Sequence, residues 1–210
     1  MTSIPPPRGC HHPCRLAAAL ALALPVVLAG DPAQAHPHVW ITADVTFAAP
    51  ENRLHEIRHT WRFDELFSDF LAGEYDQDGD GRFSPEETAR LQDEAFSLLA
   101  ETDYLSDLRV GEQRIPLQTV TGFAAAIEPD SRLVTYRFAL PLPEPVPLGD
   151  GIRLALYEET FYVDIGLTGP EAAAVEGSSA CKTELGVDSD IDLLGGLFHP
   201  PVIRLTCASS

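Results

Sequence analysis

The residues with the clearest chemical potential lie in one stretch from Asp76 to Glu87, which reads DQDGDGRFSPEE. Aspartates alternate along its first half, and a glycine follows them where the chain must turn sharply. This spacing matches the loop of a calcium-binding EF-hand, which surrounds a hard cation with oxygen ligands. The seventh position contributes its backbone carbonyl and the ninth can act through water. The predicted calcium ligands are Asp76, Asp78, Asp80, Arg82, Ser84 and Glu87.

Both flanks of this loop have helical character. Before it, hydrophobic residues recur at helical spacing from Phe63 to Leu71. After it, Ser84 is placed to cap a helix that carries Pro85 in its first turn. We therefore expect an EF-hand-like helix–loop–helix unit inserted at about residues 64–104, in which calcium braces the fold; a calcium-sensor role is the alternative. The alternative is an acidic surface turn that only resembles the pattern.

The first 35 residues have the features of an export signal. Two arginines precede an apolar run at 16–29, and Ala33-Gln34-Ala35 offers a small-residue cleavage site. The run is too short to indicate a membrane span. We expect a signal peptide over residues 1–35, with His36 as the first mature residue. The mature protein is then a soluble periplasmic protein without a stable membrane anchor.

Cysteine usage agrees with export. Two of the four cysteines leave with the signal, and Cys181 and Cys207 remain. An even pair in an oxidising compartment predicts one disulfide. The two residues lack the local C-x-x-C pattern that would favour a zinc site.

The chain is strongly acidic, with a formal net charge of −18. The predicted signal removes two arginines and one aspartate, so the mature chain is more acidic still. This charge argues against binding to nucleic acid or to anionic lipid. It favours a protein that attracts cations.

The rest of the chain reads mainly as strands. Apolar and polar residues alternate over 39–47 and 57–63, with Pro50-Glu51-Asn52 between them as a turn. We expect an α+β, mainly β fold: one domain over 36–210, built as an antiparallel β-sandwich or open barrel. Pro141–Pro147 is interpreted as a stiff crossover, and 171–198 as largely irregular. Further strands are expected at 105–110, 114–120, 123–128, 133–140, 152–157, 161–167 and 202–207.

Histidine placement suggests a second metal site. If strands 38–47 and 54–63 pair with Ile41 opposite Trp61, the odd-numbered residues share the core face. His55 and His59 then lie in the core, where a packed histidine is the ordinary interpretation. His36 and His38 lie on the opposite face, and the same register brings His38 close to Asp64.

Cleavage before His36 would expose an α-amine beside its own imidazole, a pair that can chelate one metal ion. His38 and Asp64 could complete the site, and such ligands suit Ni²⁺, Co²⁺, Zn²⁺ or Cu²⁺ better than calcium. The alternative is a leader strand in which histidines happen to fall. His199 is a lone histidine in a turn and a weaker candidate.

Several segments of the mature chain resemble a bacterial periplasmic family, domain of unknown function 1007, also labelled the periplasmic component of an uncharacterised ABC-type transport system. The resemblance rests on HPHVWITADVTF, TWRFDELFSDFL, DQDGDGRFSPEE, LYEETFYVDIGL and VIRLTC. It implies that His36, His38 and the EF-hand-like insert are family features. It also implies a membrane metal permease as partner, because genes of the family lie beside nickel/cobalt-type permeases. Glu158-Glu159 stands where the family carries Asp-Pro, so that segment receives no ligand role.

The leading hypothesis is a non-enzymatic periplasmic protein that binds a divalent transition metal for a permease and carries a structural calcium. Two alternatives stay open. One is a calcium-stabilised interaction module without a transition metal, and the other is an oxidative copper enzyme that uses the His36 chelate. The sequence has no G-x-S-x-G or H-E-x-x-H motif and no cysteine–histidine nucleophile pattern, which disfavours the enzyme.

Overall fold

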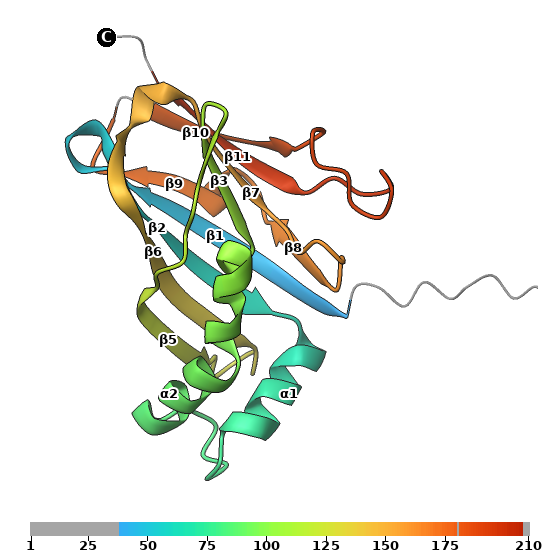
Figure 1. Cartoon of the computed structure of the whole chain (residues 1–210). Coiled ribbons are helices and arrows are strands. Elements are labelled where there is room, and N and C mark those ends of the chain that lie inside the picture. The colour runs from blue at the N-terminus through green and yellow to red at the C-terminus, as the bar shows by residue number, and fades with distance from the viewer. Residues whose placement is uncertain (1–37, 180, 208–210) are drawn as a thin grey trace, which may run out of the picture. The chain divides into compact units, whose positions relative to one another are not determined.

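The computed structural model describes residues 38–179 and 181–207, and they form two β-sheets with a helical insertion (Figure 1). His36 and the predicted signal peptide lie outside the described residues. The first sheet has the strand order β5-β6-β2-β1-β8, and β9 pairs with the same edge of β1 as β8. Its strands are β1 (Val39–Ala48), β2 (Arg53–Phe63), β5 (Thr121–Ile127), β6 (Val134–Pro147), β8 (Val163–Leu167) and β9 (Ala173–Glu176).

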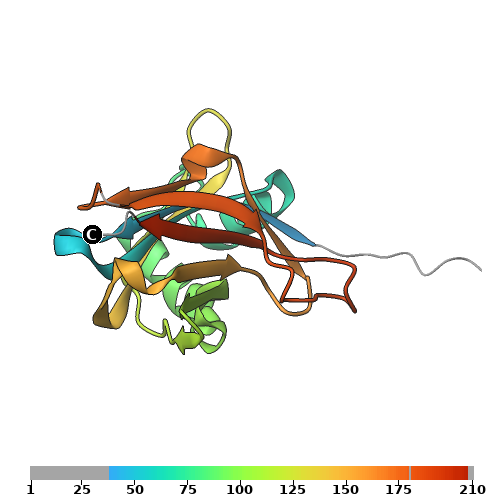
Figure 2. The same cartoon turned by 90° about the horizontal axis from the view of Figure 1, so that it is seen from above.

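The second sheet has the order β10-β11-β7-β3-β4. In both views β10 and β11 lie side by side, and the loop that joins them projects beyond their ends (Figure 2). Neither sheet closes on itself, so the predicted mainly β fold is confirmed as a sandwich, not a barrel. The strands are β3 (Ser106–Val110), β4 (Gln113–Ile115), β7 (Ile152–Leu156), β10 (Cys181–Val187) and β11 (Pro201–Cys207).

One hydrophobic core fills the space between the sheets. Inward residues of β1 and β2, such as Phe47 and Trp61, belong to the same buried cluster as Leu108, Leu154 and Ile203 of the second sheet. The period-2 alternation of these strands explains the arrangement, since every second side chain faces inward.

The helical insertion follows β2 directly. α1 (Glu65–Tyr75) begins at Asp64, whose carboxylate accepts a hydrogen bond from the backbone N–H of Phe67. α2 (Pro85–Glu94) begins with a capping box between Ser84 and Glu87. Short 3₁₀ segments complete the structure: η1 (Pro50–Asn52), η2 (Phe96–Leu105), η3 (Leu148–Asp150) and η4 (Pro170–Ala172). Among the described residues no helix is long and apolar enough to cross a bilayer.

Two predictions about the sheets need correction. β8 and β9 pair parallel with β1, so the first sheet is mixed and not purely antiparallel. The Pro141–Pro147 run is part of β6 and pairs with the start of β2. β5 pairs with β6 only as far as Ala139, so the prolines lie where that side of the strand has no ladder to interrupt.

The segment 171–198 also contains more order than its composition predicts. β9 and β10 both lie within it, and β10 pairs along its whole length with β11. Its strands are stabilised by long-range pairing, which a weak local pattern does not reveal.

Candidate metal centre

The loop between α1 and α2 gathers three carboxylates. Ligand oxygens of Asp76, Asp78 and Asp80 all lie within 4.8 Å of one another. Hydrogen bonds within the loop set this geometry. The backbone N–H of Gly81 donates to Asp76 Oδ2 at 2.9 Å, and that of Arg82 donates to Asp80 Oδ1 at 2.8 Å. Short polar side chains that bond to nearby N–H groups commonly shape such turns.

One oxygen of this group stands out. Asp76 Oδ1 is buried and has no hydrogen-bond partner among the described residues. A buried carboxylate oxygen without a partner is costly, so such an atom calls for an explanation. An all-oxygen group of this kind has the chemistry that Ca²⁺ prefers, and a bound calcium would satisfy Asp76 Oδ1. The three aspartates therefore fit the predicted ion.

Glu87 lies outside this group of three. Its Oε1 accepts the backbone N–H of Gln77 at 2.6 Å, and its Oε2 accepts that of Ser84 at 2.8 Å. These hydrogen bonds, the one from Ser84 first, lower the pKa of Glu87 and favour its ionised form. Its role as a calcium ligand stays a prediction.

The remaining loop positions have structural roles of their own. Ser84 Oγ accepts the backbone N–H of Glu87 at 3.3 Å and so caps α2. Gly79 and Gly81 have φ angles of +70° and +82°, values that favour glycine. The ligand roles of Arg82 and Ser84 stay predictions.

The region near the second predicted metal site is organised differently from the expectation. Ile41 pairs with Phe63 and not with Trp61, so the register differs by two residues. As a result Trp40, not His38, lies beside Asp64, and its backbone N–H donates to Asp64 Oδ2 at 2.9 Å. Both oxygens of Asp64 thus accept backbone hydrogen bonds.

His38 instead contacts Tyr162, the residue directly before β8. Its backbone N–H donates to the carbonyl of Tyr162 at 2.9 Å, and the two rings lie 4.9 Å apart. His36, the other half of the predicted chelate, lies outside the described residues. The transition-metal site therefore stays a prediction.

The two histidines predicted to lie in the core differ in burial. His59 is buried against Phe138, with ring centroids 5.0 Å apart, as expected. His55 is exposed, which corrects the prediction for it. A β-bulge between Leu54 and Glu56 shifts the alternation, so His55 leaves the core face.

Three further predicted residues have defined partners. Cys181 and Cys207 form the predicted disulfide and are direct neighbours across β10 and β11. His199 Nδ1 lies 3.0 Å from the carbonyl of Ile191 and 3.2 Å from Asp192 Oδ1. His199 therefore helps to hold the turn that contains it.

Sequence reasoning missed one neighbour of the loop. Arg132, from the turn between β5 and β6, lies against Gly81. The two residues are far apart in the chain, and no local pattern connects an arginine in one turn with a glycine in another.

Comparison with known proteins adds a family. The model of the family described as "Protein of unknown function (DUF1007)" matches residues 20–191. The chain belongs to that family. One relative, the "Uncharacterized 15.5 kDa protein in trpE 3'region" of Spirochaeta aurantia, is 27% identical to this chain over 142 residues. The match covers 67% of this chain and 100% of that protein.

Proposed function

We propose that this DUF1007 chain is an exported calcium-binding protein whose helix–loop–helix insertion holds one Ca²⁺ through Asp76, Asp78 and Asp80. The observation that carries the proposal is Asp76 Oδ1, a buried oxygen that has no hydrogen-bond partner in the described part of the chain and lies beside two further carboxylates. Glu87 would join the ion by exchanging its hydrogen bonds to the loop. Extracellular sites of this class bind calcium with a Kd of about 10⁻⁴–10⁻³ M.

The helical insertion is the part of the fold that calcium would brace. Leu71 of α1 and Leu91 of α2 are buried in the common core, so the loop joins two helices that are both anchored. Binding to the folded chain alone stabilises it by mass action. The role is therefore structural, and the disulfide supports location in an oxidising compartment, for which we propose the periplasm.

We further propose that the protein is not an enzyme but binds Ni²⁺, Co²⁺, Zn²⁺ or Cu²⁺ through His36 and His38 and transfers the ion to a membrane permease. Support comes from the HPH start and the resemblance to the family. His38 directly precedes β1, and its ring lies 4.9 Å from that of Tyr162. A chelate there would lie at the start of β1, which pairs with β2 and β8.

A third candidate role is binding to a protein partner. Leu66 and Phe70 of α1 are 73% and 60% exposed, and Leu98 is 68% exposed. An apolar groove of about 460 Å³ lies nearby, lined in part by Phe67 and Leu99. This role becomes the leading one if the exported protein binds calcium and none of the four transition metals.

Calcium titration of the exported, processed protein tests the principal proposal. Calorimetry should give one site for wild type and no saturable heat for Asp76→Asn. Asp93→Asn is the matched control, because Asp93 is an exposed acid on α2 outside the loop. Equal binding by wild type and Asp76→Asn would contradict the assignment, as would equal losses in both variants.

A further inference from the structure

Four arginines form a continuous row across the second sheet. Arg114 of β4 pairs with Arg109 of β3, Arg109 pairs with Arg153 of β7, and Arg153 pairs with Arg204 of β11. They make up four of the fourteen basic residues in a chain with a net charge of −18. Like charges directly opposite one another destabilise a sheet. The repulsion within such a row must therefore be offset by nearby acids or by a bound anion.

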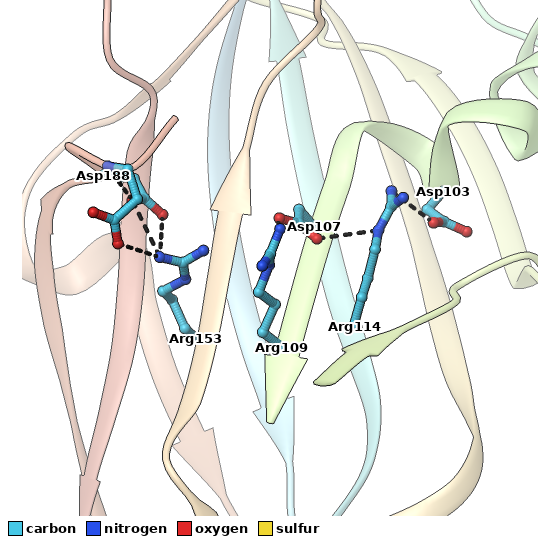
Figure 3. Close-up of polar contacts among 7 residues, drawn as sticks. Asp103, Asp107, Arg109, Arg114, Arg153 and Asp188 are labelled. Carbon is cyan, nitrogen blue, oxygen red and sulfur yellow. Dashed lines mark hydrogen bonds and ion pairs between the residues drawn. The ribbon is translucent and has the colours of Figure 1, made fainter. Parts of the chain in front are cut away.

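Buried acids provide part of the compensation. Asp107 accepts a hydrogen bond from Arg109 Nε at 3.0 Å and lies 3.1 Å from Arg114 Nε. Asp188 lies 2.9 Å from Arg153 Nη1, and its side chain is fully buried. Figure 3 shows Asp188 beside Arg153 at one end of the row, Asp107 between Arg109 and Arg114, and Asp103 beside Arg114 at the far end. The acids hold the guanidinium groups in fixed orientations.

These contacts use only part of each guanidinium group. Arg109 meets Asp107 through Nε, and Arg153 meets Asp188 and Asp190 through Nη1. Both Nη groups of Arg109, and Nε and Nη2 of Arg153, have no partner within the described ranges. The same holds for all donors of Arg204. Guanidinium donors in a fixed fork match the oxygens of carboxylate and phosphate groups.

The donors face a hollow of suitable size. A cavity of about 480 Å³ on the outer face of the sheet is lined by Arg109, Arg153 and Arg204. Glu112 and Asp190 also line it, and Asp190 is 81% exposed, so solvent screens its charge. Three adjacent strands span roughly 10 Å. A single small ligand with more than one anionic group can reach all three arginines.

We propose that this arginine row is a binding site for a small oxyanion that carries two or more carboxylate or phosphate groups. Arg109 and Arg153 are held in place by buried acids and present their remaining N–H groups to the ligand. Arg204 completes the site from β11; Glu184 lies opposite it on β10, but among the described residues Arg204 forms no ion pair. The site is separate from the calcium loop and does not depend on it.

Calorimetry with citrate, pyrophosphate and inorganic phosphate tests this site on the processed protein. The protein is first stripped of metal on a chelating resin, because citrate and phosphates bind calcium, and sodium chloride holds the ionic strength constant. We expect saturable binding that Arg204→Gln weakens by about tenfold or more, the loss typical of a charge-assisted hydrogen-bonded contact. Tighter binding of citrate than of pyrophosphate assigns carboxylate ligands, and the reverse order assigns phosphate.

Arg62→Gln is the matched control, because Arg62 is an exposed arginine on β2 of the other sheet. Its binding should stay within twofold of wild type. Arg109→Gln gives a second test at the other end of the hollow. The proposal is overturned if no probe binds, or if Arg62→Gln weakens binding as much as Arg204→Gln does. Equal melting temperatures of Arg204→Gln and wild type show that the variant is folded.

Discussion

Arg132 lies across Gly81 so closely that a Cβ atom added to Gly81 would be 2.6 Å from Arg132 Nη1. The turn between β5 and β6 therefore covers the sixth position of the predicted calcium loop. This contact connects the helical insertion with the first sheet at a point remote from its two chain connections. It also places a guanidinium group beside a loop rich in carboxylates.

Gly81→Ala should destabilise the metal-free protein by about 1–3 kcal/mol, mainly because alanine is strained at this positive φ; the added Cβ also displaces the flexible end of the Arg132 side chain. Urea unfolding at a fixed pH measures the loss. Gly79→Ala is the control, because Gly79 also has a positive φ but no atom within 4 Å of the added Cβ. If the two variants lose equal stability, the contact with Arg132 does not contribute to the destabilisation.

The disulfide should stabilise the C-terminal hairpin substantially. It closes a loop with a sequence separation of 26, for which chain entropy predicts about 3.5 kcal/mol. Urea unfolding with and without a reducing agent should show this difference. The double variant Cys181→Ser, Cys207→Ser should unfold like the reduced wild type and should not respond to the reductant. An unchanged urea midpoint of the wild type after reduction would contradict the predicted stabilisation.

His59 should make the fold sensitive to mild acid. Burial lowers its pKa to about 3 from an ordinary value of 6.5. Below pH 6.5 His59 is therefore protonated in the unfolded chain but stays neutral in the folded chain. The free energy of unfolding is therefore highest above pH 6.5 and decreases as the pH falls from 6.5 towards 3. At pH 5 this loss is about 2 kcal/mol.

His59→Leu should remove that part of the pH dependence, measured as the free energy of unfolding between pH 7 and pH 5. His55→Leu is the control on the same strand, because His55 is exposed. A pH profile for His59→Leu that parallels wild type would rule out His59 as the source.

The transition-metal proposal predicts that affinity depends on the free amine of His36. Calorimetry with Zn²⁺, Ni²⁺, Co²⁺ and Cu²⁺ should show tight binding by protein that begins at His36. One extra residue before His36 should weaken binding strongly, since it blocks the amine and leaves the imidazole. His38→Ala should weaken it as well, while calcium binding is retained. Equal affinities of the native and extended forms would exclude the chelate.

Local patterns in the sequence predicted local structures well. The helix–loop–helix insertion, the Pro50–Asn52 turn and the inward face of β1 each depend on residues a few positions apart. The disulfide was also predictable, because only two cysteines follow the apolar N-terminal run. The bulge that turns His55 outward was not, since it arises from how β2 pairs with β6.

The sequence by itself determined the α+β class, the acidic loop between two helices and the paired cysteines, because spacing and composition specify them directly. Only the tertiary structure decided which distant segments meet. It paired β8 and β9 parallel with β1, laid Arg132 over Gly81, and aligned Arg109, Arg153 and Arg204 across three strands. Strand order and register follow from burial of the whole core, a global property that no short stretch of sequence contains.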